Sequence, residues 1–537
     1  PNKQIIKSRF RNKKRSINMK VPNSLIYLFF CAYFLAFYLQ CSISYDYTSA
    51  TIDRNKFPPD FVFGTASSSY QYEGATDVDG RTPSIWDTFV KKHPEKISDH
   101  SNANSAEEFY YRYKEDVSLM KEIGLDSFRF SISWSRILPQ GRINGGVNQK
   151  GVDFYNNLID ELLLNGIQPL VTLFHWDLPQ ALDDEYGGFL SSKIVDDYRD
   201  YADLCFKEFG DRVKQWITFN EPNLYSKRGY GTGAYAPGRC SSYIGNCTAG
   251  DSATEPYVVS HNSILSHAAA VDLYRKKYKA SQKGTIGLAM AVTWTVPKYP
   301  TISCKAAALR ELDFFFGWII HPMVYGDYPK VMRHRLGNRL PHFTKAQMKI
   351  VKGTLDFVGV NYYTANYAED AAVHSSYNLS YTTDSGVNLT TQKNGRLIGE
   401  QTGATWLHIY PEGIRGIALY ITRVYNKIPI IVTENGMPSF ESGSTSKNAT
   451  LKDGLRIKYI YLHLSKLLDA IKDGANVKGY YIWSFLDNFS WASGYTLRYG
   501  VYYVDYKEGL ERYPKLSAFW LKKMLRKEKT ETVAKLQ

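Results

Sequence analysis

Short apolar runs rich in β-branched and aromatic residues alternate with stretches of helical periodicity along most of the chain. Helical patterns cover 107–123, 151–165, 193–209, 255–279 and 455–473. Continuous apolar strands separated by helices are typical of a parallel sheet that is covered on both faces. Eight such units match the count of a closed (β/α)8 barrel. The predicted strands are 61–69, 127–134, 168–176, 215–222, 285–292, 356–364, 429–436 and 477–485.

We therefore predict an α/β fold, a single (β/α)8 TIM barrel with long loop insertions, over residues 55–528. The chain has 537 residues, which exceeds the usual size of one domain, but barrels of this class can reach several hundred residues. No short-period repeat and no low-complexity linker divides the sequence further.

The first 44 residues are excluded from the predicted barrel. Met19 is the first methionine, and it is followed by Lys20 and an apolar run over 25–39. This order is typical of a secretory signal peptide, and the run is short for a helix that spans a bilayer. A transmembrane anchor and a plastid transit peptide remain open as alternatives. We interpret 1–44 as upstream sequence plus a signal peptide, whose removal leaves a protein of the secretory pathway without membrane contact.

The net charge of +14 comes mainly from this N-terminal segment. Residues 1–18 hold seven basic side chains and no acidic one, and without them and Lys20 the net charge is +6. A charge of this size supports solubility and provides no basic face, so we expect no nucleic-acid partner.

Cysteine usage and glycosylation acceptors agree with an oxidising compartment. Cys240 and Cys247 lie in a Gly-rich loop, close enough in sequence to form a disulfide. No CxxC pair occurs, so no metal site is expected. A further acceptor pattern, at Asn488, is predicted to be buried. The expected glycosylation sites, all in turn-like stretches, are Asn246, Asn378, Asn388 and Asn448.

Polar and aromatic residues gather where the predicted strands end, and barrels of this class carry their chemistry at the C-terminal ends of the strands. Two of them are carboxylates, and such a pair suits the cleavage of a glycosidic bond. Each residue alone has a structural alternative: an ion pair for the arginine, caps or turns for the amides, and core packing for the tryptophans. Their convergence from seven strands is hard to explain by packing. These residues are Gln71, Arg129, His175, Trp176, Asn220, Glu221, Asn361, Tyr363, Glu434, Asn435 and Trp483.

The two glutamates stand in the motifs TFNEP (218–222) and VTENG (432–436), which are highly specific in this order and at this separation. Five more motifs are FVFGTASSSYQYEGA (61–75), FRFSISWSRILP (128–139), FHWDLP (174–179), VGVNYYT (358–364) and LDNFSWASGYTLRYGVYYVD (486–505). Together they make the chain resemble a plant β-glucosidase of glycoside hydrolase family 1, from about residue 55 to about residue 525.

The resemblance implies different roles for the two glutamates. Glu434 would be the nucleophile, and Glu221 the proton donor and then the base, in a retaining mechanism with the carboxyl groups about 5–5.5 Å apart. Arg129 and the hydroxyl of Tyr363 would favour the ionised form of Glu434, whose charge would raise the pKa of Glu221. No cofactor is needed. The substrate-binding residues would be Gln71, His175, Trp176, Asn220, Asn361, Trp406, Trp483, Ser490 and Trp491.

The chain departs from the family pattern at Ser490. The family usually reads NFEW here, and its glutamate bonds the 4- and 6-hydroxyls of the terminal glucose. Relatives that act on 6-phosphoglucosides carry a serine too, but with a lysine seven positions on, where this chain has Leu497. Phosphate recognition is therefore not expected. A looser glucose site, a drifted but still glucose-specific site, and a site for a sugar substituted at the 6-position remain open.

The aglycone side is expected to be lined by Arg228, Tyr235, Trp406 and Ala492. Trp406 resembles the flat wall on which the family stacks aglycones, with core packing as the alternative.

We predict a retaining β-glucosidase that hydrolyses a small plant glycoside with an alkaloid, phenolic or terpenoid aglycone, in the apoplast or the vacuole. One alternative is a primeverosidase-like β-diglycosidase, which releases a 6-linked disaccharide intact. An alternative from another class is a non-catalytic sugar-binding or storage protein on the same scaffold. The expected partner is a small-molecule β-glucoside, and assembly into a homo-oligomer stays open.

Overall fold

The computed structural model describes residues 47–371, 377–442 and 445–526. Contacts divide the chain into two compact units, Pro1–Ser49 and Ala50–Gln537. The described part of the first unit is the short turn η1 (Tyr47–Ser49), and all other described elements belong to the second unit. The predicted upstream sequence and signal peptide, 1–44, lie outside the described residues.

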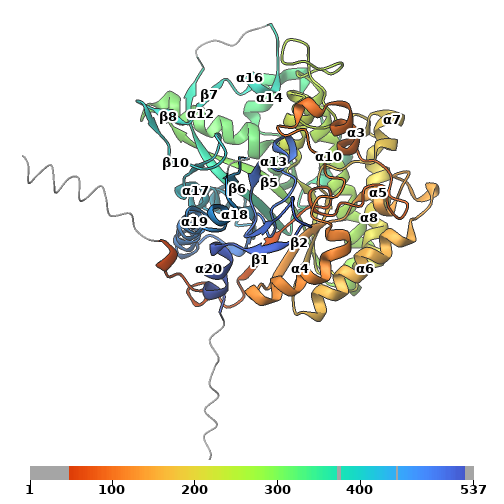
Figure 1. The fold of residues 1–537 in the computed structure, drawn as a ribbon. Helices are drawn as coiled ribbons and strands as arrows, with labels where there is room; N and C mark the ends of the chain where they lie inside the picture. Colours follow the sequence, from red (N-terminus) through yellow and green to blue (C-terminus); the bar gives the residue numbers. More distant parts are fainter. Residues whose placement is uncertain (1–46, 372–376, 443–444, 527–537) are drawn as a thin grey trace, which may run out of the picture. The chain divides into compact units, whose positions relative to one another are not determined.

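Eight parallel strands of the second unit close into a barrel (Figure 1). They pair in the order β12, β14, β1, β2, β3, β4, β5 and β6, and β12 pairs with β6 to complete the ring. Each predicted apolar run supplies one strand, so the predicted (β/α)8 barrel is confirmed. The strands are β1 (Val62–Ala66), β2 (Ser127–Ser131), β3 (Gln168–Phe174), β4 (Gln215–Asn220), β5 (Thr285–Pro297), β6 (Phe357–Asp370), β12 (Ile430–Asn435) and β14 (Val477–Ile482).

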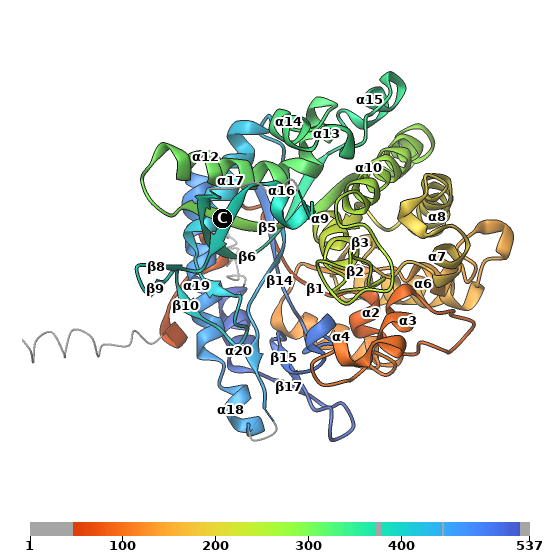
Figure 2. The same cartoon turned by 90° about the horizontal axis from the view of Figure 1, so that it is seen from above.

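Helices surround these strands when the barrel is seen from above (Figure 2), with α17, α19 and α20 on one side and α6, α8 and α10 on the other. They bury their apolar faces against the strands, as the helical periodicity predicts. Four of the five predicted helices agree with the structure within two residues at each end. The main helices are α4 (Phe109–Ile123), α6 (Gln149–Leu164), α8 (Ile194–Phe209), α10 (Glu255–Leu273), α17 (Glu412–Val424), α19 (Gly454–Lys472) and α20 (Leu516–Met524).

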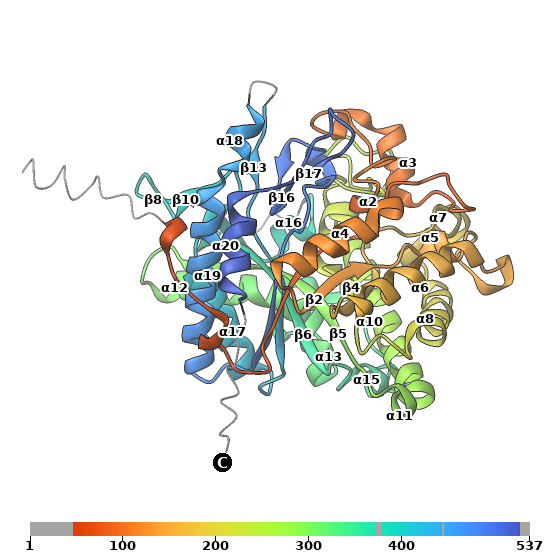
Figure 3. The ribbon, with the colours of Figure 1, turned by 60° about the horizontal axis from the view of Figure 1, so that its bottom comes forward.

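Long insertions between the barrel elements carry shorter helices. In Figure 3, α3 and α18 lie at one end of the barrel with β16 and β17, whereas α11 and α15 lie at the opposite end. The short α-helices are α2 (Ser69–Tyr72), α3 (Ile85–Lys92), α5 (Trp134–Ile137), α7 (Gln180–Tyr186), α9 (Pro222–Ser226), α11 (Lys279–Gln282), α12 (Ile302–Leu312), α13 (Trp318–Tyr325), α14 (Lys330–Leu336), α15 (Lys345–Val351), α16 (Tyr381–Asp384) and α18 (Lys447–Leu451). The 3₁₀ and π turns are η2 (Arg54–Lys56), η3 (Pro94–Lys96), η4 (Ile143–Gly145), η5 (Gly188–Leu190), η6 (Lys227–Gly231), η7 (Tyr274–Tyr278), η8 (Asp313–Gly317), η9 (Gly337–Arg339) and η10 (Trp491–Ser493).

The insertions also form small antiparallel pairings. β7 (Val387–Thr390) extends the barrel sheet beside the outer part of β6. The other pairs are β8 (Gln392–Lys393) with β9 (Arg396–Leu397), β10 (Glu400–Gln401) with β11 (His408–Ile409), β13 (Ser439–Phe440) with β15 (Leu497–Arg498), and β16 (Tyr502–Val504) with β17 (Arg512–Pro514).

The predicted disulfide between Cys240 and Cys247 is present in the structure. All four predicted glycosylation sites are exposed, and Asn488 is fully buried, as expected. The expectation that every acceptor lies in a turn is wrong for two of them, because Asn388 is in β7 and Asn448 is in α18. An edge strand and a short exposed helix present asparagine to solvent as well as a turn does. Within the described residues, no helix combines the length and the apolar character needed to cross a bilayer.

Candidate active site

Two buried glutamates meet at the C-terminal end of the barrel. Glu434 is in β12, and Glu221 directly follows β4; both side chains line a cavity of about 450 Å³. Glu221 has a φ of 46° and immediately precedes α9, so the chain turns sharply where β4 ends. Trp176, after β3, has a φ of 76°. Left-handed backbone at non-glycine residues is costly and gathers at functional sites, which agrees with the position of both residues here.

Glu434 is held by a cation and a hydroxyl. Arg129, in β2, donates from Nη1 to Oε1 of Glu434 at 2.5 Å, and Tyr363 donates its hydroxyl to Oε2 at 2.7 Å. Burial raises the pKa of Glu434, while the charge of Arg129 and the hydrogen bond from Tyr363 act in the opposite direction. These two contacts favour the carboxylate, as predicted from the sequence.

Among the described residues, no cation forms an ion pair with Glu221. Its Oε1 accepts a hydrogen bond from Nδ2 of Asn361 at 2.9 Å. Burial, followed by repulsion from Glu434, raises the pKa of Glu221 to about 8. Since the contacts with a cation and a tyrosine hydroxyl fall on Glu434, the pair ionises at Glu434 first and Glu221 keeps its proton near neutral pH.

Amide side chains connect the two carboxyl groups. Oδ1 of Asn220 accepts from Nη2 of Arg129 at 2.6 Å and from Nδ2 of Asn361 at 3.0 Å. Nδ2 of Asn220 lies 2.9 Å from Nε2 of His175. Burial and the charge of Arg129 lower the pKa of His175 well below its usual value, so this imidazole is neutral. The network fixes the side chains around both glutamates through residues of β2, β4 and β6.

The structure brings almost all of the predicted site residues to one cavity. Arg129 is fully buried and does not line the cavity itself. It contacts two residues that do, Glu434 and Asn220. The prediction for Ala492 is wrong: its side chain does not line the cavity, and its carbonyl accepts from the amide of Ser98. The predicted residues that line the cavity are Gln71, His175, Trp176, Asn220, Glu221, Arg228, Tyr235, Asn361, Tyr363, Trp406, Glu434, Trp483, Ser490 and Trp491.

Aromatic rings form much of the wall. The rings of Trp176 and Trp491 lie 4.6 Å apart, and Trp176 donates its indole N–H to the carbonyl of Asn220 at 2.9 Å. Because that donor is used, Trp176 offers its ring surface and no further hydrogen bond. Trp406 is 50% exposed and packs edge-on against Tyr363. Core packing is therefore excluded for Trp406, which stands at the solvent side of the cavity.

Ser490 belongs to the segment 488–490, which is held in place by hydrogen bonds from Gln71. Nε2 of Gln71, in α2, donates to Oδ1 of Asn488 at 3.0 Å and to the carbonyl of Phe489 at 2.8 Å. The hydroxyl of Ser490 donates to the carbonyl of Leu497 at 3.1 Å, and both residues line the cavity. This part of the wall consequently carries a small neutral residue beside an apolar one.

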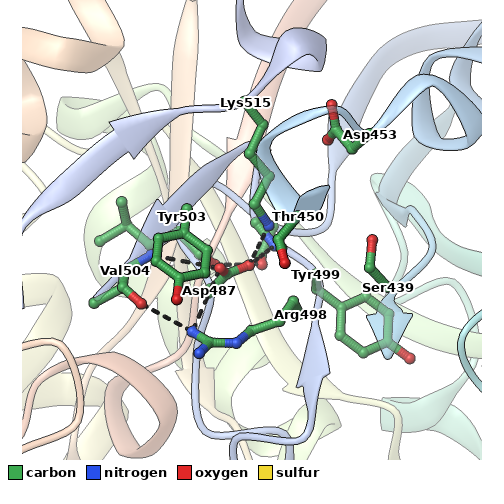
Figure 4. Close-up of polar contacts among 12 residues, drawn as sticks. Ser439, Thr450, Asp453, Asp487, Arg498, Tyr499, Tyr503, Val504 and Lys515 are labelled. Atoms are coloured by element: carbon green, nitrogen blue, oxygen red, sulfur yellow. Dashed lines mark hydrogen bonds and ion pairs between the residues drawn. The ribbon is translucent and has the colours of Figure 1, made fainter. Parts of the chain in front are cut away.

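Buried charges anchor the residue that precedes this segment (Figure 4). Asp487 accepts from Nζ of Lys515 at 2.6 Å and from the amide of Gly500 at 2.9 Å, and Arg498 lies 3.6 Å away. Asp487 and Lys515 are fully buried. Burial lowers the pKa of Lys515 to about 8, although the charge of Asp487 opposes this shift. The ion pair thus joins the start of α20 to the residue directly before the segment that carries Ser490.

Sequence reasoning missed several residues of the wall. Tyr499 stands in the long motif at 486–505, so the sequence offered a signal for its place in the wall. Lys227 directly precedes Arg228, which was predicted, and this adjacency was a usable signal. Thr364, Ser493 and Leu497 also stand in quoted motifs. Most of the others lie in β5, β6 or α9, and only Phe315 and Thr391 come from insertions. The missed residues are Leu224, Lys227, Ala291, Val292, Thr293, Phe315, Thr364, Asn366, Thr391, Ser493, Leu497 and Tyr499.

The cavity chemistry is that of acids, amides and aromatic rings. In the described ranges, no group of three or more His, Cys, Asp and Glu side chains is arranged to hold a metal ion. A protonated acid beside an ionised carboxylate, in a cavity with aromatic walls, is suited to general acid and nucleophilic catalysis on a sugar acetal.

Known proteins share this sequence and architecture. The model of the family described as Glycosyl hydrolase family 1 matches residues 53–530. β-Glucosidase 17 of Arabidopsis thaliana is 61% identical over 472 residues, which cover 88% of this chain and 91% of that protein. The isoflavonoid 7-O-β-apiosyl-glucoside β-glycosidase of Dalbergia nigrescens is 52% identical, with 90% and 87% covered. The crystal structure of the rice Os3BGlu6 β-glucosidase superposes with a TM-score of 0.87 at 49% identity, with 89% and 100% covered.

Proposed function

Because the chain belongs to glycosyl hydrolase family 1 and is a hydrolase of glycosidic bonds, we propose that it is a retaining β-glucosidase. Its substrate would be a small plant glycoside with an alkaloid, phenolic or terpenoid aglycone. The observation that carries this proposal is the pair of buried glutamates in one cavity, of which Glu434 alone forms an ion pair within the part of the chain that the structure describes. That asymmetry supplies a nucleophile and an acid at the same pH.

In the first step, the carboxylate of Glu434 attacks the anomeric carbon while Glu221 gives its proton to the departing aglycone oxygen. The glycosidic bond breaks and an ester forms between the sugar and Glu434. Arg129 and Tyr363 keep the nucleophile ionised before the attack. Gln71, His175, Asn220 and Trp483 line the cavity and hold the glucose unit.

In the second step, the ester has removed the negative charge of Glu434. Burial still raises the pKa of Glu221, but the added repulsion from Glu434 then ends. The pKa of Glu221 falls, and its carboxylate takes a proton from water. The hydroxide attacks the anomeric carbon, the ester bond breaks, and Glu434 is regenerated. Two inversions give a product of retained configuration.

The nucleophile is tested by Glu434→Ala. Turnover of p-nitrophenyl β-glucoside should be lost, and added azide should restore cleavage and give the α-glycosyl azide, because azide occupies the face that Glu434 has vacated. Rescue with a β-product would contradict the proposed role. Turnover by the unaltered enzyme also decides against the alternative of a non-catalytic sugar-binding or storage protein.

The acid is tested by Glu221→Ala with two leaving groups. The rate should fall by about 10²–10⁴-fold for a poor leaving group, which needs a proton. Formation of the glycosyl-enzyme from a dinitrophenyl glucoside should fall much less, because this leaving group departs without protonation. Equal losses for both substrates would remove Glu221 from the role of acid.

A second candidate function is that of a β-diglycosidase. The small side chain of Ser490, whose hydroxyl is bonded to the carbonyl of Leu497, leaves room and no charge in this part of the wall. The Dalbergia nigrescens relative, with 52% identity, is named as a β-glycosidase of an apiosyl-glucoside. The first observation favours a sugar substituted at the 6-position, and the second agrees with a disaccharide that would be released intact.

The two functions are separated by Ser490→Glu. The larger, charged side chain should exclude 6-O-xylosyl and 6-O-apiosyl glucosides. Simple glucosides should gain up to about 10–100-fold in kcat/KM, since a hydrogen bond to a charged group contributes about 1.5–3 kcal/mol. Product analysis by mass spectrometry distinguishes a disaccharide from glucose. If the unaltered enzyme cleaves none of the 6-linked diglycosides, the diglycosidase function is wrong and the β-glucosidase function is retained.

A further inference from the structure

In addition to the two glutamates, two cationic side chains line the same cavity. Lys227 and Arg228 begin the π turn η6, which follows α9 and so comes soon after Glu221 in the chain. Lys227 is half-buried and Arg228 is exposed. Among the described residues of the cavity wall, the carboxylates are Glu221 and Glu434 alone. The rest of the wall therefore carries an excess of positive charge.

Neither cation is neutralised by an ion pair in the described parts of the chain, where no carboxylate oxygen lies within 4 Å of either one. Each is instead placed near aromatic rings. Nζ of Lys227 lies 5.5 Å from the ring centroid of Phe315, and the guanidinium carbon of Arg228 lies 5.7 Å from that of Tyr235. Both rings also line the cavity. Cation–π contacts of this kind orient a charge without neutralising it.

Lys227 is in an environment that compensates its charge only in part. Burial lowers its pKa, the charge of Glu311 opposes this shift in part, and the charge of Arg228 lowers the pKa further. An anion bound in the cavity beside Lys227 and Arg228 would add to this compensation. The planar guanidinium and the ammonium would together take a carboxylate, which has two acceptor oxygens.

We propose that Lys227 and Arg228 form a subsite that selects an aglycone with an anionic group, such as a carboxylate. Phe315, Tyr235 and Trp406 provide the adjacent apolar and aromatic wall, which suits a planar acid. The inference rests on the proposed β-glucosidase activity and narrows its substrate class. Lys227 and Arg228 act on binding and leave the bond cleavage to the glutamates.

The test uses two glucosides with the same leaving group, the phenolic β-glucosides of 3-(4-hydroxyphenyl)propanoic acid and of its amide. The two-carbon spacer separates the charge from the phenol oxygen, so the pair differs in charge alone. The unaltered enzyme should show a kcat/KM at least about tenfold higher for the acid, since charge-assisted hydrogen bonds exceed neutral ones. The preference should shrink at high salt, where an exposed cation is screened. This comparison needs no variant.

Variants then locate the effect. In Lys227→Met with Arg228→Gln, the acid-to-amide ratio of kcat/KM should fall to about one, while Lys227→Arg should keep it. Arg423→Gln is the matched control, because Arg423 is exposed on α17 and its loss changes the net charge without touching the cavity. An equal fall in the control would assign the preference to the overall charge and overturn the subsite.

The outcomes separate the inference from the proposed function. If the enzyme cleaves p-nitrophenyl β-glucoside and the amide but does not prefer the acid, the subsite is wrong and the β-glucosidase stands. If the preference persists in the double variant, the subsite is also wrong. If no glucoside is cleaved at all, the proposed function fails and the inference fails with it.

Discussion

Glu221 and Glu434 are the same residue type, and their surroundings give them different chemistry. Each is 4% exposed, yet one contacts an arginine and a tyrosine hydroxyl whereas the other contacts an amide. The difference in pKa follows from these few contacts and from the order in which the pair loses its protons. A consequence for stability can be measured on the free enzyme.

The pKa of Glu221, about 8 in the folded chain, lies above its value in the unfolded chain. The contribution of Glu221 to stability is therefore fully present below about pH 4.5 and is lost as the pH rises through 8. Glu221→Gln carries no charge, so the variant should gain stability relative to the unaltered enzyme over this window. The gain should reach a few kcal/mol, since one pKa unit corresponds to about 1.4 kcal/mol.

Thermal unfolding of both proteins at pH 5 and pH 8.5 checks this expectation. The difference in unfolding midpoint should be larger at pH 8.5. Glu508→Gln, at an exposed position, is the control and should show the same difference at both pH values. If the difference between Glu221→Gln and the unaltered enzyme is no larger at pH 8.5 than at pH 5, the pKa of Glu221 is not raised and the residue is ionised near neutral pH.

For single residues, the sequence predicted the roles of those that stand in motifs. The contacts of Glu434 with Arg129 and Tyr363 were expected and are present. It failed for Ala492, because η10 turns its carbonyl toward Ser98 and leaves the adjacent Trp491 and Ser493 to line the cavity. Lys227 was missed because it stands in no motif, and its position next to the predicted Arg228 was the one available signal.

Among the elements, apolar periodicity predicted every barrel strand but not where β5 and β6 end. The predicted runs ended at 292 and 364, whereas the strands continue to Pro297 and Asp370. Past the barrel rim they pair with each other and with β7, so their residues are only partly buried and the continuous apolar signal disappears. Pairing between segments far apart in sequence decides these lengths.

The anchoring of the Ser490 segment to α20 is another contact between distant elements. Lys515→Met leaves Asp487 with less compensation in a fully buried position and should destabilise the fold by about 3–5 kcal/mol. The KM for glucosides should rise as well, because Asp487 directly precedes the segment that lines the cavity. Chemical unfolding and steady-state kinetics measure the two effects.

Lys522→Met is the matched control on the same helix. Lys522 is half exposed and pairs with Glu122 at the surface, and such pairs contribute about 1 kcal/mol or less. Equal destabilisation by the two substitutions would show that the buried pair with Asp487 gives no special support to the fold.

Over the whole molecule, the features of the described chain fit a protein that passes through an oxidising, glycosylating compartment. The disulfide between Cys240 and Cys247 and the exposure of all four acceptor asparagines point the same way. Half of the net positive charge lies in 1–18, ahead of the predicted signal peptide. We propose that the mature protein starts near Tyr45 and is delivered to the apoplast or the vacuole.

Glycosylation tests this route and has a control within the chain. When the full chain is expressed in plant cells, glycans should be found on several of Asn246, Asn378, Asn388 and Asn448, because each side chain is exposed. Asn488 carries the same acceptor pattern but is fully buried and donates to the hydroxyl of Ser484, so it should stay unmodified once the barrel has folded. Peptide mass spectrometry before and after enzymatic deglycosylation reads each site separately. A cytosolic protein with all five asparagines unmodified and residues 19–44 retained would contradict the secretory route, whereas a glycan on Asn488 would show that modification precedes folding of the site.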